Sequence, residues 1–385
     1  MVLFYSIITI SIFLYLIFEY LKLSTSIKKI SIRIIINGTR GKSTTVKLLY
    51  EILKKNGLTV FAKITGDDPI LLKPDGSLKL IKRFSPPSIK ENIKLLIDIS
   101  KTKPDAIIME CMALHSENQS ILGKVILKPN YTIITNILPD HKEIMGTSIE
   151  ENTLTILQCV HPESTLIITE QVSNQLQDIN LKTKNIEICK SIELSYNNIN
   201  NIPYSIVKES WEVIEKLVQL IGIDIQIAKK RFLKEWELIS KKIKLNIHEN
   251  SVTVWNLFSV NDVRTFHKFV KYLQNSTEEE NIIFIFNTRI DRPLRTKEFV
   301  DYISEHYSNS RIWLFGDGKY LARKFFIQNN FIVDNLLLTT QKGIILMLKN
   351  KLLQNSILYC IGNHKKTELL TSKFKELSNS KKEII

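Results

Sequence analysis

A short glycine-containing loop constrains the fold of this chain more than any other feature. The β-branched run Ile32–Ile36 leads directly into the loop Gly38–Thr44, which reads Gly-Thr-Arg-Gly-Lys-Ser-Thr. The segment after the loop has apolar residues at helical spacing, namely Val46, Leu48, Leu49, Ile52 and Leu53. The order strand, glycine turn and helix predicts a βα unit of an α/β fold.

The residue types in this loop indicate phosphate binding. Gly38, Thr39, Arg40, Gly41, Lys42, Ser43 and Thr44 are the predicted nucleotide-binding residues. Backbone N–H groups can converge on an anion at the glycines, the helix N-terminus adds a positive dipole end, and Lys42 adds a full charge. The Ser43 hydroxyl can bind Mg²⁺ on the same phosphates, so ATP and Mg²⁺ are the expected cofactors. The alternative is an ordinary βα turn, and the Lys-Ser pair directly after Gly41 disfavours it. A general P-loop would have glycine where this chain has Ile36.

Two further strand ends carry candidate metal ligands. Glu110 follows the apolar run Ala106–Met109, and Asp140-His141 follows the run Asn130–Ile137. Ligands of α/β sheets bind at the carboxyl ends of strands, and a neutral imidazole beside a carboxylate is a good metal ligand. We therefore predict Ser43, Glu110 and His141 as metal ligands; a surface role for the acid and a structural role for the histidine are the alternatives.

A second series of strands and helices begins near Val252, with strand-like runs at 252–258, 282–286, 312–315 and 356–361. The segment Asn287–Arg292 follows the second of these runs and reads Asn-Thr-Arg-Ile-Asp-Arg. Two arginines that flank an aspartate can bind phosphate or carboxylate in bidentate fashion. A surface ion-pair turn is the alternative.

The net charge limits the classes of binding partner, and the cysteine content indicates the redox state of the compartment in which the protein works. The formal net charge of +14 over 385 residues suggests an acidic partner: nucleic acid, anionic lipid or a polyanionic substrate. The basic residues are scattered and form no nucleic-acid-binding motif, so we expect no nucleic acid partner. The four cysteines form no Cys-x-x-Cys pair and are typical of reduced cytosolic thiols.

The N-terminus predicts a single membrane anchor at residues 1–22. Val2–Phe18 has no charged residue, and the next three residues extend it to the roughly 20 that a spanning helix needs. Lys22, Lys28, Lys29 and Arg33 follow, so the positive-inside rule places the rest of the chain in the cytoplasm. A signal peptide is the alternative, but its basic n-region and small-residue cleavage site are missing.

Together these residues resemble the Mur ligase superfamily and, within it, the ligase subunit of poly-γ-glutamate synthases of the PgsB/CapB type. The resemblance covers almost the whole chain. It is carried by the anchor, Asn37–Ser43, the Pro-Asp-Gly turn at Pro74, Met109–Leu114, Asp140-His141 with Met145-Gly146, Asn287–Arg292 and Ile361–Asn363.

The resemblance implies a transmembrane helix, a central P-loop-type parallel-sheet ATP-binding domain (30–245) and a C-terminal Rossmann-like α/β domain (250–378). It implies an ATP-dependent ligase that adds glutamate to a growing poly-γ-glutamate chain through an acyl phosphate, for a capsule or a released polymer. The predicted catalytic residues are Lys42, His141, Arg289 and Asp291, with Asn287 and Arg292 as further nucleotide-binding residues. The implied partners are the glutamate polymer, the membrane and other membrane subunits of a synthase and export complex.

Other functions remain open at this point. A folylpolyglutamate synthase-like or peptidoglycan Mur-type ligase would use the same chemistry with another acceptor, whereas a membrane-anchored ATPase or kinase of a capsule system belongs to a different class. A non-catalytic polyanion-binding membrane protein would leave the loop, Glu110 and His141 unexplained. Mur ligases commonly carry a carbamylated lysine after the Asp-His motif; residues 144–160 contain no lysine, and Glu150 or Glu151 is the candidate replacement.

Overall fold

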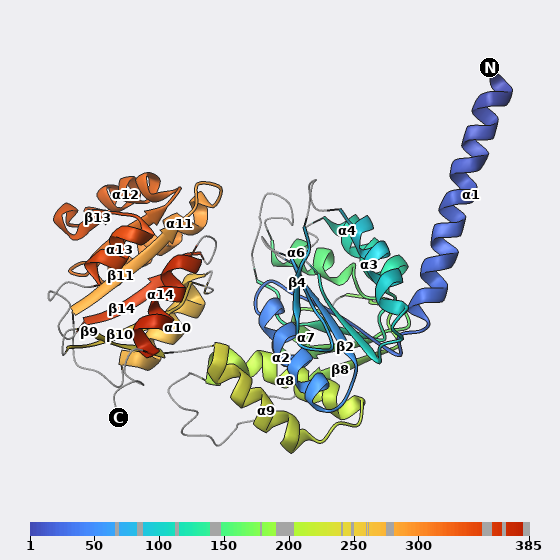
Figure 1. Cartoon of the computed structure of the whole chain (residues 1–385), viewed down its shortest axis with the longest axis horizontal. Helices are drawn as coiled ribbons and strands as arrows, with labels where there is room; N and C mark the ends of the chain where they lie inside the picture. The colour runs from blue at the N-terminus through green and yellow to red at the C-terminus, as the bar shows by residue number, and fades with distance from the viewer. Residues whose placement is uncertain are drawn as a thin grey trace. The chain divides into compact units, whose positions relative to one another are not determined.

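The computed structural model describes residues 1–65, 69–82, 88–111, 115–138, 148–177, 179–189, 204–239, 242–247, 250–258, 260, 262–274, 281–348, 356–363 and 367–379. These residues form two compact units (Figure 1). The first contains the described residues up to 189 and 207–235, and the second contains residues 204–206 and those from Trp236 on. Both units combine a mainly parallel sheet with helices, which confirms the predicted α/β class.

The sheet of the first unit has the strand order β4-β3-β2-β5-β1-β6-β7-β8. Its strands are β1 (Ile32–Asn37), β2 (Val60–Ile64), β3 (Ile70–Leu72), β4 (Leu78–Leu80), β5 (Ala106–Glu110), β6 (Tyr131–Ile134), β7 (Thr165–Thr169) and β8 (Asn185–Cys189). Strands β2, β5, β1, β6, β7 and β8 pair in parallel, whereas β3 and β4 add an antiparallel edge.

The helices of this unit are α1 (Val2–Ile27), α2 (Lys42–Lys55), α3 (Lys90–Ser100), α4 (Ser116–Ser120), the π-helical η1 (Ile121–Leu127), α6 (Ile149–Leu157), α7 (Glu170–Asn174), α8 (Tyr204–Leu220) and α9 (Ile225–Ile239). The five apolar residues predicted to face the core from α2 are all buried, which confirms the βα unit predicted from the sequence.

Strand β1 lies at the centre of the sheet because its side chains are apolar on both faces. Ile34, Ile35 and Ile36 are fully buried, as expected for a strand covered on both sides. In the register, Ile36 pairs with Glu110 of β5, and Asn37 pairs with Ile134 of β6. The carboxyl ends of β1, β5 and β6 therefore meet at one edge, where the loop after β1 begins.

Helix α1 is long and apolar enough to cross a membrane, by its length and composition. Its large apolar side chains are exposed from Leu3 to Leu21, and then Leu23 and Ile27 become 3% and 4% exposed within the core of the first unit. Figure 1 shows α1 extending from this unit beside α3. The exposed part and the buried end belong to one continuous helix.

Lys63 of β2 is a fully buried lysine with acidic and amide partners. Its side chain is 1% exposed, and its Nζ donates to Glu91 Oε1 at 2.5 Å and to Asn92 Oδ1. Both partners come from the first turn of α3. A buried charge is tolerated when it is paired and hydrogen-bonded, so this cluster fixes α3 against the sheet.

Lys63→Met is expected to lower the free energy of unfolding by about 3 kcal/mol or more, because it leaves Glu91 without its buried ammonium partner. Lys55→Met is the matched control, since Lys55 is exposed on α2 and its Nζ lies 3.7 Å from Glu51; its expected cost is about 0–1 kcal/mol. Urea denaturation of the three full-length proteins measures both values. Equal stability of Lys63→Met and the wild type would contradict this role.

The sheet of the second unit has the order β13-β12-β11-β14-β10-β9, parallel except for β9. Its strands are β9 (Lys242–Ile247), β10 (Asn250–Asn256), β11 (Asn281–Thr288), β12 (Arg311–Gly316), β13 (Leu336–Leu338) and β14 (Ser356–Ile361). Its helices are α10 (Val263–Gln274), α11 (Pro293–His306), α12 (Lys319–Gln328), the 3₁₀ helix η2 (Val333–Asn335), α13 (Gln341–Met347) and α14 (Glu368–Asn379). Aromatic residues dominate one of its cores, with Phe266 in edge contact with Phe284 and Tyr359.

Candidate active site

The loop between β1 and α2 depends on two glycines with positive φ. Gly38 has φ +126°, and a Cβ there would lie 2.4 Å from Thr135 Oγ1 and 2.8 Å from the carbonyl oxygen of Asn136. Gly41 has φ +80° and is the N-cap of α2. A side chain would be strained at both positions, so the glycines let the backbone turn sharply from strand to helix.

Asparagine side chains brace the first half of this loop. The Gly38 N–H donates to Asn37 Oδ1 at 2.8 Å, and the Arg40 N–H donates to Asn136 Oδ1 at 2.9 Å. The Thr39 N–H donates to the Asn136 carbonyl at 3.0 Å. These three N–H groups already donate hydrogen bonds to protein acceptors. The N–H groups in the first turn of a helix, in contrast, have no intrahelical acceptor. The start of α2 is therefore the part of the loop best suited to an anion.

Lys42 adds positive charge directly over the loop. It is the first residue of α2, and its Nζ donates to the Gly38 carbonyl at 2.5 Å and to the Thr39 carbonyl at 3.2 Å. The ammonium group is thus held beside the helix start, where a phosphate would bind.

Ser43 and Glu110 meet across the sheet edge, as the sequence predicts. Ser43 Oγ donates to Glu110 Oε1 at 2.8 Å, and the Thr65 N–H donates to Glu110 Oε2 at 2.9 Å. Glu110 is 2% exposed. Burial raises the pKa of its carboxyl, although the Lys42 charge and the bonds from Ser43 and Thr65 act in the opposite direction.

These two side chains fit a divalent cation. A hydroxyl and a carboxylate are the hard oxygen ligands that Mg²⁺ and similar ions prefer. The raised pKa shows that the hydrogen bonds present do not fully offset the burial of this carboxylate. A metal ion beside Ser43 and Glu110 would supply the missing positive charge.

The third predicted ligand, His141, lies outside the described residues, as does the neighbouring Asp140. Of the candidate replacements for the absent lysine, Glu151 forms a capping box at the start of α6. Its carboxylate accepts the Ser148 N–H at 3.2 Å, and its own N–H donates to Ser148 Oγ at 3.1 Å. How a second metal would be held stays an open prediction.

Helix α8 contributes residues that sequence reasoning missed. Asn136 Nδ2 donates to Glu209 Oε2 at 2.9 Å, and Ser210 Oγ lies 3.0 Å from Thr45 Oγ1 on α2. Asn136 thus connects the loop at Arg40 to α8. Only the position of Asn136 at a strand end could have drawn attention to this network.

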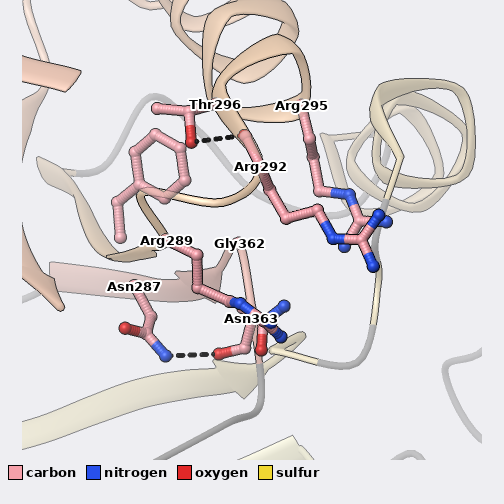
Figure 2. Close-up of a pocket in the computed structure, with 8 residues that line it drawn as sticks. Asn287, Arg289, Arg292, Arg295, Thr296, Gly362 and Asn363 are labelled. Atoms are coloured by element: carbon pink, nitrogen blue, oxygen red, sulfur yellow. Dashed lines mark hydrogen bonds between the residues drawn. The ribbon is translucent and has the colours of Figure 1, made fainter. Parts of the chain in front are cut away.

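Three residues of the predicted segment, Asn287, Arg289 and Arg292, line a small pocket in the second unit, whereas Asp291 is exposed and does not line it. The lining residues are Phe286, Asn287, Arg289, Arg292, Arg295, Thr296, Gly362 and Asn363 (Figure 2). Asn287 Nδ2 donates to the Asn363 carbonyl at 2.7 Å. Gly362 has φ +100°, and a Cβ there would lie 2.2 Å from the Asn287 carbonyl oxygen. The ends of β11 and β14 therefore approach closely and form the floor.

Three arginines make this pocket basic. Arg289 donates to both carboxylate oxygens of Asp291, at 2.8 and 2.6 Å, and this contact holds the pKa of Asp291 below its ordinary value. Figure 2 shows the Arg292 and Arg295 side chains leaving the start of α11 in the same direction. Sequence reasoning missed Arg295. Pro293 after Arg292 is typical of a helix start, and Arg295 follows Arg292 at the i, i+3 spacing that brings two side chains to the same face of a helix. A pocket of this kind suits phosphate or carboxylate.

Family models match both parts of the chain. Residues 36–230 match the Mur ligase middle domain, and residues 243–377 match the poly-gamma-glutamate synthase CapB C-terminal domain. The PGA synthase CapB of Bacillus subtilis (strain 168) is 26% identical over 363 residues, which cover 91% of this chain and 92% of that protein.

Solved structures share the fold. Escherichia coli FolC in complex with DHPP and ADP has a TM-score of 0.64 at 10% identity, covering 94% of this chain and 92% of that one. A bifunctional folylpolyglutamate synthase/dihydrofolate synthase with Mn, AMPPNP and L-glutamate bound has a TM-score of 0.64 at 11% identity, covering 92% of each chain. The Mur ligase middle-domain match spans half of the chain, and the loop, Glu110 and the C-terminal match agree with it: this protein belongs to the Mur ligase family, as a member of the CapB type.

Proposed function

We propose that this protein is an ATP-dependent ligase that adds glutamate to a growing poly-γ-glutamate chain. The observation that carries the proposal is the 2.8 Å contact between Ser43 and Glu110, at the start of a helix whose first residue is Lys42. This arrangement provides a phosphate cradle and two metal ligands, which activation of a carboxylate by ATP requires.

Each residue of this site has a distinct task in the proposed reaction. The start of α2 binds the phosphates, and Lys42 balances charge on the transferring phosphoryl group. Ser43 and Glu110 hold a divalent cation, for which we propose Mg²⁺, and this ion adds positive charge at the γ-phosphate when bound. We propose that His141 assists as a third ligand. A carboxylate of the acceptor then attacks the γ-phosphorus and expels ADP. The amine of glutamate attacks the resulting acyl phosphate, loses a proton and expels phosphate as the amide forms.

The substrate class follows from the relatives and from charge. The Bacillus subtilis relative is a PGA synthase, and one structure of the same fold holds Mn, AMPPNP and L-glutamate. A net charge of +14 suits a polyanionic product. These facts support glutamate, its γ-linked polymer and a nucleotide with a divalent metal as the ligands of this chain.

We propose that the second-unit pocket binds an anionic group of one substrate, with Asn287, Arg289, Asp291 and Arg292 as predicted from the sequence and Arg295 in addition. The Arg289–Asp291 contact orients one guanidinium group by two hydrogen bonds. The shared chemistry is a phosphate or a carboxylate, either of which accepts bidentate hydrogen bonds from arginine.

Arg292→Ala and Arg295→Ala are each expected to raise the KM of either ATP or glutamate by about 10–100-fold, the usual cost of one charge-assisted hydrogen bond. Arg311→Ala is the matched control, because Arg311 is exposed at the opposite end of the neighbouring strand β12. Separate KM measurements for ATP and glutamate identify the anion. Unchanged values for both substrates in both variants would remove this pocket from the mechanism.

We propose that α1 is a retained single-pass anchor and that the two units lie in the cytoplasm. Cleavage after this segment, as in a signal peptide, would remove Leu23 and Ile27 from the hydrophobic core. Retention at the membrane would keep synthesis beside the other subunits of a synthase and export complex, which we also propose as partners.

A substrate screen tests the proposed function. The full-length protein in membranes, with its partner subunits, is incubated with ATP and one amino acid at a time, and ADP release is measured. We expect glutamate to stimulate release and a γ-linked polymer to grow. ADP release that no amino acid stimulates would favour an ATPase, and release that requires a folate or a peptidoglycan precursor would favour those ligases.

A further inference from the structure

The end of α1 joins the first unit through a braced junction. Leu23 and Ile27 are buried in the core, and α1 contacts α3 and η1. Arg33, at the start of β1, closes the junction: its Nη1 donates to the Ile30 carbonyl at 2.8 Å and its Nε donates to the Lys128 carbonyl at 2.9 Å. The anchor is therefore tied to the unit by packing and by hydrogen bonds.

Contacts with α1 identify the surface that lies at the membrane boundary. The apolar stretch that begins at Val2 reaches about 30 Å, the thickness of the hydrocarbon layer, near Leu21. Lys128, which ends η1, has its Nζ 5.4 Å from the centroid of the Tyr20 ring and 3.4 Å from its hydroxyl. A side chain that touches Tyr20 lies at the depth of Tyr20 for any tilt of α1. With α1 as the proposed anchor, the C-terminal end of η1 is therefore placed near the headgroup level.

Lysines from α1 and α3 gather at the same level. Lys101 Nζ lies 2.8 Å from Asp98 on α3. The hydrogen bond from Lys101 holds the pKa of Asp98 below its ordinary value, and the charges of Lys101, Lys94 and Lys22 add to this effect. Three lysines from α1 and α3 thus act on the Asp98 carboxylate, and Lys128 lies against Tyr20 of α1. These four lysines outnumber the two nearby acids in the sequence of α1 and α3, Glu19 and Asp98.

Exposed apolar side chains lie on η1, the short helix that leads to Lys128. Ile121 and Val125 on η1 are 40% and 42% exposed, although the same short helix buries Leu122 and Ile126. Basic residues next to exposed aliphatic residues are typical of elements that rest in the headgroup region of a bilayer.

We propose that the surface formed by Tyr20 and Lys22 of α1, Lys94 and Lys101 of α3, and Ile121, Val125 and Lys128 at η1 binds anionic phospholipid headgroups. This proposal depends on the proposed role of α1 as a membrane anchor. It holds the first unit in one orientation on the bilayer, with β1 running from the junction to the phosphate loop over a strand length of about 20 Å.

Site-specific quenching in nanodiscs tests this surface with the full-length protein. A fluorophore is attached at Val125→Cys, and the nitroxide quencher is carried on a lipid headgroup. The four native cysteines are buried, so labelling is directed to the new thiol. Ile186→Cys on the edge strand β8 is the matched control, since Ile186 is 42% exposed, as is Val125. Each protein is measured in phosphatidylcholine with and without phosphatidylglycerol.

We expect the label at position 125 to be quenched, more strongly with phosphatidylglycerol, and the label at 186 to be unaffected. Lys128→Glu, or Lys94→Glu if the first variant does not fold, should lower the phosphatidylglycerol preference at least about fivefold, because each lysine near an anionic surface contributes about that factor. Lys184→Glu, before β8, should not change it. Equal quenching at 125 and 186, or equal quenching in both lipids, would overturn the proposal and favour a protein partner on this surface. The measurement needs neither ATP nor glutamate, so it is independent of the proposed ligase activity.

Discussion

Lys42→Ala is expected to lower glutamate-dependent ADP release and polymer growth by about 10³-fold or more. Its ammonium group lies over the loop carbonyls of Gly38 and Thr39, beside the helix start that would bind the phosphates. Removal of one preorganised cation from a transferring phosphoryl group typically costs this much in rate. Initial rates at saturating ATP and glutamate provide the measurement.

The control for this variant is Lys55→Ala, at the other end of α2. It tests whether loss of a lysine from this helix affects activity in general, and we expect the wild-type rate. A melting temperature close to the wild type would show that Lys42→Ala is folded. Polymer growth in Lys42→Ala at a tenth of the wild-type rate or above would contradict the role assigned to this lysine.

Glu110→Gln is expected to lower ligase activity and at the same time to raise the stability of the ligand-free protein. It removes the carboxylate that pairs with Ser43, so ligase activity should fall by about 10²–10³-fold. The ligand-free protein should become more stable, because the neutral amide carries no buried charge. A divalent cation added alone should raise the melting temperature of the wild type by binding the folded state and leave that of the variant unchanged.

The pH dependence of stability follows from the same carboxyl group. Burial raises its pKa above the ordinary value of 4.5, so above pH 4.5 and up to the raised pKa the folded state binds more protons than the unfolded state. The contribution of Glu110 to the free energy of unfolding therefore decreases as pH rises through this interval. Glu110→Gln should remove this contribution, so its stability relative to the wild type should rise with pH through the interval, whereas Glu117→Gln, on an exposed residue of α4, should show no such rise. A variant less stable than the wild type at every pH would contradict this reading of Glu110.

Much of the fold was predictable because it depends on local patterns. The β-branched run before Gly38 and the helical spacing after Lys42 determine β1 and α2, and both were confirmed. The proximity of Ser43 and Glu110 followed from a general rule: parallel strands bring their carboxyl ends to one edge. The same rule pointed to Asn287–Arg292, which begins at the carboxyl end of β11.

The parts that could not be predicted depend on distant residues. Asn136 meets Arg40 across 96 positions and Glu209 across 73, and no local pattern encodes such pairs. The π-helical form of η1 has no periodicity that distinguishes it in a sequence. Arg295 shares the pocket with Arg292 because α11 begins at Pro293, directly after the segment that lines the pocket, and sequence patterns place such helix boundaries poorly.

Transfer of oxygen from carboxylate to phosphate tests the proposed chemistry most directly. A γ-linked glutamate acceptor whose terminal carboxylate carries ¹⁸O is incubated with ATP, glutamate and the membrane-embedded complex, and the released phosphate is analysed by mass spectrometry. Attack of the carboxylate on the γ-phosphate, followed by displacement by the amine, leaves one acceptor oxygen on each phosphate. We therefore expect one ¹⁸O atom per phosphate released, in step with amide formation. Phosphate without ¹⁸O would show that ATP is hydrolysed by water, and would contradict a ligase mechanism for this protein.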